Sequence, residues 1–260
     1  MTVLRRIVEA KLPSLRGKKQ NPDYRRRVYE LAENRREVKN LLDFCCPKSV
    51  AVIAEVKRAS PSEGLIREVD PVEVAKLYQK GGACAVSVLT EENFFKGSLD
   101  FLSRIREAVD LPLLRKDFIV DELEVWEAKA FGADAVLLIA KVLDEVLLRD
   151  LIETALGLGL LPLVEVFEEN ELERVLKYYS TAVGVNNRNL ETLEVDLSVS
   201  ERLLPLMKEA GVKCAVAESG IFTAGDVRRL KRAGADAFLV GTALMKSPDP
   251  LKKLSELLSA

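Results

Sequence analysis

The chain has 260 residues, of which 48% are hydrophobic and 31% charged, and its formal net charge is −2. This near-neutral balance gives no sign of the basic surface that binds nucleic acid. The chain contains no histidine, so proton transfer near neutral pH would have to use Lys, Glu or Asp side chains with shifted pKa values. No stretch of about 18 residues is apolar and uncharged, so we expect no membrane-spanning helix.

The four cysteines lack the paired spacing of a zinc site, and without histidine we expect neither a metal nor a cofactor. Cys84 and Cys214 lie within apolar runs, which predicts buried thiols in a reducing cytoplasm. Residues 1–6 lack the apolar stretch of a signal peptide, in agreement with a cytoplasmic protein.

Residues 1–48 have a polar, helical pattern, and Pro13 and Pro22 are expected to divide them into short helices. This segment carries 13 Lys and Arg against 6 Asp and Glu. Its basic character has two interpretations. The segment either attracts an anion toward a nearby site or is an amphipathic helix packed on an acidic body.

From residue 50 onward, short apolar runs alternate with amphipathic stretches of helical period. Eight of each predict the parallel β-α units of a (β/α)8 TIM barrel, an α/β fold. The alternative is a doubly wound open sheet, but no G-x-G-x-x-G follows the first run, and eight strands can close. We predict one domain, 1–260, with 1–48 as an N-terminal helical extension. The expected strands are 50–54, 83–89, 111–114, 133–140, 161–166, 181–185, 212–217 and 236–240. The expected helices are 72–80, 99–109, 121–131, 144–158, 169–179, 197–210, 224–233 and 250–258.

Polar residues gather at the carboxyl ends of seven of these eight strands, where barrel enzymes have their active sites. Glu55 and Lys57 end the first strand, and their spacing points both to the same side. The opposite strand ends carry fewer polar residues, and this asymmetry favours a functional site. The other strand-end residues are 115–118, Lys141, Glu165, 186–189, 218–220, Gly241 and Thr242.

Taken singly, several of these residues also have a structural interpretation. Glu165 could form an ion pair with Lys141. Lys116 and Asp117 could be solvated neighbours at a turn.

Glycines after the last two strands predict a phosphate site. Gly220 precedes a helix expected near Thr223, and Gly241 precedes one expected near residues 248–250. Loops at these positions of a barrel commonly bind phosphate through backbone N–H groups. Ser60, in the first loop, could add a hydroxyl. The residues therefore predict a small phosphorylated substrate.

Taken together, several segments resemble the indole-3-glycerol-phosphate synthase family, the ring-closing enzymes of tryptophan biosynthesis. The resemblance covers nearly the whole chain, including the extra N-terminal helices, and its motifs follow in order on the expected strands. The matching segments are 53–62 (IAEVKRASPS), 87–91 (SVLTE), 95–98 (FKGS), 114–118 (LRKDF), 163–166 (LVEV), 184–190 (GVNNRNL) and 217–221 (AESGI).

The resemblance implies a metal-free carboxy-lyase that acts on 1-(2-carboxyphenylamino)-1-deoxyribulose 5-phosphate, closes the indole ring and releases CO2 and water. Lys116 would be the general acid that protonates the ribulose carbonyl, since negative charge builds on that oxygen. Lys57 would pair with the anthranilate carboxylate, and Glu165 would act in the dehydration. How acid and base roles divide among Lys57, Glu55 and Glu165 stays open.

The resemblance also implies binding roles. Glu55, Asn186 and Glu218 would hold the sugar hydroxyls and stabilise cationic intermediates. Phe95 would form part of an apolar wall for the aromatic ring, and Arg188 would be a cation at the edge of the site. Many relatives have Ser where this chain has Thr242, which keeps the hydroxyl. The expected phosphate-binding residues are Ser60, Ser219, Gly220, Gly241 and Thr242.

Two alternative functions predict different residues at the strand ends. A phosphoribosylanthranilate isomerase would be expected to have a catalytic Cys near the end of the first strand, where this chain has Glu55 and Lys57. A non-catalytic barrel subunit of a tryptophan-pathway assembly would be expected to lack Lys116 or Glu165, and both are present. The expected assembly is a monomer or a weak association with other enzymes of that pathway.

Overall fold

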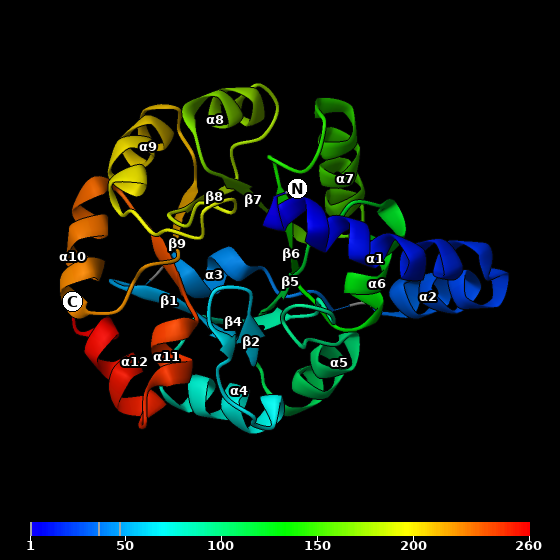
Figure 1. Ribbon diagram of the computed structural model, residues 1–260, viewed down its shortest axis with the longest axis horizontal. Coiled ribbons are helices and arrows are strands. Elements are labelled where there is room, and N and C mark those ends of the chain that lie inside the picture. The colour runs from blue at the N-terminus through cyan, green and yellow to red at the C-terminus, as the bar shows by residue number, and fades with distance from the viewer. Residues whose placement is uncertain (1, 36, 47) are drawn as a thin grey trace.

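The computed structural model describes residues 2–35, 37–46 and 48–260. These residues form a closed barrel of eight parallel strands in the order β1-β10-β9-β8-β7-β6-β5-β4, surrounded by helices (Figure 1). The predicted (β/α)8 barrel is confirmed. The barrel strands are β1 (Ala51–Val56), β4 (Ala85–Leu89), β5 (Leu113–Lys116), β6 (Ala135–Ile139), β7 (Leu161–Val166), β8 (Ala182–Asn186), β9 (Cys214–Glu218) and β10 (Ala237–Val240). The outer helices are α4 (Pro71–Lys80), α5 (Leu99–Ala108), α6 (Glu122–Ala130), α7 (Glu145–Gly157), α8 (Glu169–Leu176), α9 (Ser198–Glu209), α10 (Ala224–Ala233) and α12 (Pro250–Leu258).

Four strands continue one or two residues beyond the apolar pattern. β1 extends to Val56, β5 to Lys116, β8 to Asn186 and β9 to Glu218. A polar residue ends the hydrophobic signal, but it can still pair with its neighbours; Leu89, for example, pairs with Lys116. Key polar side chains are therefore held by the sheet rather than by loops.

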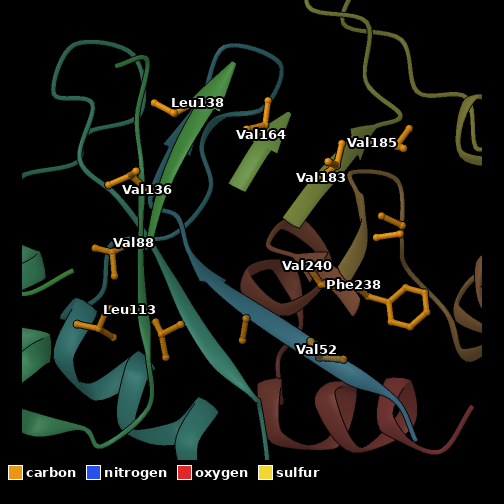
Figure 2. Packing of buried hydrophobic residues seen from close by; sticks show 14 of the residues in the cluster. Val52, Val88, Leu113, Val136, Leu138, Val164, Val183, Val185, Phe238 and Val240 are labelled. Carbon is orange, nitrogen blue, oxygen red and sulfur yellow. The ribbon is translucent and has the colours of Figure 1, made fainter. Parts of the chain in front are cut away.

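The core has two layers because alternate strand residues point to opposite faces. Inward residues such as Ile53, Leu137 and Leu239 fill the barrel. Outward residues such as Val52 and Val164 pack between the strands and the helices (Figure 2). Both faces of the sheet are thus apolar, which explains the nearly continuous hydrophobic runs in the sequence.

Most outer helices begin at a side-chain cap. Thr223 accepts a hydrogen bond from the Asp226 N–H, and the Asp226 carboxylate accepts one from Thr223, which forms a capping box. The predicted start of this helix near Thr223 is confirmed. The side chains of other capping residues also accept backbone hydrogen bonds, namely Asp70 (α4), Ser98 (α5), Asp121 (α6), Asp144 (α7) and Asp249 (α12).

The N-terminal extension folds as a helical hairpin, α1 (Val3–Gln20) and α2 (Pro22–Asn34), that projects from one side of the barrel (Figure 1). Pro22 separates the two helices as predicted, but the expected break at Pro13 is wrong, because α1 runs through it. Buried Ile7 and Leu15 lie on either side of Pro13. Their packing outweighs the hydrogen bond that proline removes.

A third helix of the extension, α3 (Leu41–Cys45), lies at the amino ends of the strands. Its Cys45 forms a disulfide with Cys84, with their Cα atoms 5.2 Å apart. The expectation of a thiol at position 84 is therefore wrong, whereas Cys214 is a buried free cysteine as expected. The spacing of the cysteines did not reveal the pair, because only the fold brings α3 against β4.

Three short elements were not predicted. A hairpin of β2 (Ala59–Ser60) and β3 (Gly64–Leu65) follows β1. The helix expected to begin near residues 248–250 is preceded by an extra one, α11 (Thr242–Lys246), directly after β10. In the described part of the chain, no helix has both the length and the apolar character needed to cross a membrane.

Candidate active site

A lysine and two glutamates form a buried cluster at the carboxyl ends of β5, β7 and β9. The Lys116 ammonium lies 3.1 Å from Oε2 of Glu165 and 2.5 Å from Oε2 of Glu218. Burial opposes the charge of Lys116, but the carboxylates of Glu165, Glu218 and Glu55 outweigh it and raise the Lys116 pKa. Lys116 is therefore a cation in the free protein and has a proton to donate.

Glu218 is the titratable member of this cluster near neutral pH. Burial raises its pKa to about 8; the Lys116 ammonium opposes this rise and the Glu165 carboxylate adds to it. The shift supplies what a chain without histidine needs, namely a group that gains and loses a proton close to pH 7.

A second charged pair ends β1. The Lys57 ammonium lies 3.0 Å from Oε1 of Glu55, and both side chains are largely buried. Gly241 faces this pair so closely that a Cβ there would lie 2.3 Å from Oε1 of Glu55. The glycine therefore leaves space for the carboxylate. The prediction that Glu55 and Lys57 point into one space is confirmed.

The loop after β8 is held by its own polar groups. The Asn186 side-chain oxygen accepts a hydrogen bond from the Arg188 N–H at 2.9 Å. The Arg188 guanidinium donates to the Leu193 carbonyl at 2.7 Å. Both side chains are thereby fixed where they border the same pocket.

One pocket joins these groups. It encloses about 1030 Å³, a volume that includes open solvent at its mouth. All predicted site residues line it except Glu218, which lies behind Lys116. The predicted residues that line it are Glu55, Lys57, Ser60, Phe95, Lys116, Glu165, Asn186, Arg188, Ser219, Gly220, Gly241 and Thr242.

The predicted phosphate-binding residues lie together in three loops of this pocket. Ser60 comes from the hairpin after β1, and its hydroxyl lies 3.3 Å from that of Ser62. Ser219 and Gly220 have positive φ angles of 65° and 77° after β9. A positive φ is uncommon for a residue other than glycine, so Ser219 gives this turn an unusual backbone shape beside the pocket.

Another part of the pocket is aromatic. The rings of Phe95 and Phe118 have centroids 5.9 Å apart. The Glu91 carboxylate accepts hydrogen bonds from three N–H groups of the loop, including that of Phe95 at 3.0 Å. Leu4 and Ile7 of α1 also line the pocket. The N-terminal extension is therefore part of the site.

A family model described as indole-3-glycerol phosphate synthase matches residues 4–257. The indole-3-glycerol phosphate synthase of Aquifex aeolicus (strain VF5) is 48% identical over 238 residues, which cover 92% of this chain and 93% of the relative. The chain belongs to the indole-3-glycerol phosphate synthase family. That of Carboxydothermus hydrogenoformans is 49% identical over 211 residues, 81% of this chain and 80% of the relative.

Solved structures of other barrels share the fold at low identity. A 3-hexulose-6-phosphate synthase superposes with a TM-score of 0.63 at 17% identity, covering 81% of this chain and 99% of that one. A tryptophan synthase alpha-subunit mutant (D110N) from Pyrococcus furiosus has a TM-score of 0.64 at 16% identity, covering 81% and 98%. At this identity the likeness establishes the barrel alone.

The contacts of Glu165 and Asp117 differ from the structural interpretations given for them above. Glu165 pairs with Lys116, while Lys141 lies 3.9 Å from Glu191 instead. Asp117 is buried rather than solvated, and Lys11 of α1 contacts it at 2.8 Å. The isomerase interpretation is not supported either, because the family match is to the synthase.

Sequence reasoning assigned no role to several residues around the pocket. Phe118 lies within the segment 114–118 that resembles the family, so its position shortly after Lys116 could have indicated a place in the site. Leu4 and Ile7 gave no signal, because nothing local reveals that the start of α1 borders the pocket. Within residues 2–35, 37–46 and 48–260, no group of three or more His, Cys, Asp and Glu side chains could hold a metal ion.

Proposed function

We propose that this pocket converts 1-(2-carboxyphenylamino)-1-deoxyribulose 5-phosphate into indole-3-glycerol phosphate, CO2 and water, the reaction of the family. The observation that carries the proposal is Lys116, a buried cation at the base of a pocket that also contains two phenylalanine rings and glycine-rich loops. A substrate with an aromatic acid at one end and a phosphate at the other fits this distribution of groups.

Ring closure is the step for Lys116. The aromatic carbon that bears the carboxylate bonds to the ribulose carbonyl carbon, and the carbonyl electron pair moves to oxygen. Lys116 donates its proton to that oxygen as the charge develops. The carbon–carbon bond to the carboxylate then breaks, CO2 leaves, and the electron pair restores the aromatic ring. Lys57 holds the carboxylate until that point.

Dehydration is the step for Glu165 and the Glu55–Lys57 pair. The new hydroxyl takes a proton and leaves as water, and the neighbouring ring carbon loses a proton to give the indole. Glu165 lies within reach of Lys116, so a proton can return to the lysine after each turnover. Asn186 and Glu55 orient the sugar hydroxyls.

The phosphate lies against the loops of Ser60, Ser219–Gly220 and Gly241–Thr242. Backbone N–H groups can supply most of this binding, and the hydroxyl of Thr242 replaces the serine of many relatives. Arg188 adds a cation at the edge of the site. Phe95 receives the aromatic ring.

We further propose that the enzyme works in the cytoplasm as a monomer or in weak association with other tryptophan-pathway enzymes. The pocket supports the monomer, because residues of a single chain line it. Sedimentation across a range of protein concentrations tests the assembly, and a stable dimer at nanomolar concentration would contradict it.

The activity itself has a direct test. Purified protein is mixed with the carboxyphenylamino-deoxyribulose phosphate in the presence of a chelator, and the fluorescence of the indole product is followed. We expect product to form without added metal. Absence of product across a wide range of temperatures would contradict the proposal.

A further inference from the structure

Glu218 occupies an unusual place among the charged residues of the site. It is 1% exposed and does not line the pocket. Its Oε2 contacts Lys116, whereas its Oε1 has no hydrogen-bond partner among the described residues. The position of this carboxyl group is therefore set by its contact with Lys116, by the neighbouring Glu165 carboxyl group and by packing.

The packing partner is Gly184 of the neighbouring strand β8. A Cβ on Gly184 would lie 2.2 Å from Oε1 of Glu218 and 3.2 Å from its carboxyl carbon. Its φ does not fall in the left-handed region, so the backbone conformation does not require glycine. Glycine within a strand is less stable than alanine, because it loses more backbone entropy on folding. The reason for a glycine at position 184 must therefore lie in the residues around it.

We propose that Gly184 is a positioning residue, whose missing side chain creates the space in which the Glu218 carboxyl group lies and so fixes Lys116 between Glu218 and Glu165. The proposal rests on the function assigned to Lys116 above. Gly184 touches neither substrate nor reacting atoms; it acts through Glu218.

The sheet determines which group must yield when the space is filled. Gly184 pairs with Glu165 of β7 and with Val216 of β9, so its backbone is held on both sides. A methyl group at position 184 therefore displaces the Glu218 carboxyl group. Since Glu218 bonds to Lys116, the ammonium moves with it. A misplacement of about 1 Å can reduce a rate by about 10²-fold.

The test compares Gly184→Ala with Gly157→Ala, a glycine near the end of α7 whose added Cβ would meet nothing within 4 Å. We expect Gly184→Ala to lower kcat at least 10-fold with KM changed less than threefold, because the substrate-binding loops are untouched. The pH profile of kcat should also shift, which a purely structural defect would not produce. Gly157→Ala should retain both constants. An unchanged kcat in Gly184→Ala would overturn the proposal.

A double-mutant cycle provides a second test in case the Gly184→Ala protein loses activity because it folds poorly. In a Glu218→Ala background the carboxyl group is gone, so adding Gly184→Ala should lower neither kcat nor the unfolding temperature further. Equal losses in both backgrounds would show that Gly184 acts independently of Glu218 and would overturn the proposal. The unfolding temperatures report this coupling even if the wild-type protein makes no indole product. Failure of the Gly184 proposal can therefore be distinguished from failure of the proposed function.

Discussion

At the scale of single residues, the site performs acid–base chemistry with lysine and glutamate alone. Two opposing effects determine which of these side chains is charged. Burial disfavours charge on Lys116 and Glu218, whereas the pairing of Lys116 with two carboxylates favours it on the lysine. As a result, the lysine keeps its proton, and the carboxyl group of Glu218 titrates near neutral pH.

Lys116→Ala should lower kcat by at least about 10²-fold, the usual scale for loss of a general acid. Lys141→Ala is the matched control, because Lys141 also follows a barrel strand but does not line the pocket. Steady-state kinetics with the fluorescent product measure both. A near-normal rate for Lys116→Ala would overturn the assigned role.

Glu218 should also make stability depend on pH. Its pKa is raised from 4.5 to about 8, so between these values the folded protein holds a proton that the unfolded chain has released. The free energy of unfolding should therefore fall as pH rises through this window. Glu218→Gln should flatten that slope. Denaturant titrations from pH 5 to pH 9 test this, and identical slopes in both proteins would contradict it.

At the scale of elements, α1 is tied to the barrel by buried charge. Lys11 contacts Asp117 at 2.8 Å and Glu124 at 2.6 Å, and Lys18 contacts Glu127 at 2.9 Å. These contacts favour the packing interpretation of the basic N-terminal segment over attraction of an anion. They also hold the helix where it borders the pocket.

Lys11→Met should destabilise the protein by less than the about 3–5 kcal/mol of a fully unpaired buried charge, because Asp117 and Glu124 lose one cationic partner and keep Arg115. KM should rise as well, since Leu4 and Ile7 would no longer be held at the pocket. Arg5→Met serves as control, because its pair with Glu9 is exposed and contributes less than about 0.5 kcal/mol. Similar losses in both variants would contradict the role of Lys11.

At the scale of the whole molecule, the extension contacts both ends of the barrel. Helix α1 borders the pocket at the carboxyl ends of the strands, and α3 lies at their amino ends, where the Cys45–Cys84 disulfide fastens it. The bond joins residues 39 apart in sequence. It therefore ties the extension to the closed sheet.

Cys45→Ser should lower the free energy of unfolding by about 4 kcal/mol, the chain-entropy estimate for a loop of this length. Cys46→Ser, at an exposed position next to it, should change little. Denaturant unfolding with and without reductant measures both. If reductant left wild-type stability unchanged, the disulfide would contribute nothing to the fold.

Much of this architecture could be read from local pattern. The alternation of apolar runs and amphipathic stretches predicted the barrel, because each strand is buried on both faces and each helix on one. The polar strand ends predicted the pocket, since a closed parallel barrel brings all its carboxyl ends to one mouth. The exact strand ends were missed, because polar residues that still pair in the sheet resemble loop residues. The extra helix α11 was missed because its five residues are too few to show a helical period.

The sequence by itself determined the fold class, the family and the residues that meet at the mouth of the barrel, because all three depend on residue order along single elements. Only the tertiary structure decided which charges pair, that α1 completes the pocket, that Cys45 joins Cys84, and that Gly184 leaves space for Glu218. These contacts join residues far apart in the chain, and their distances follow from how the barrel closes rather than from any local pattern.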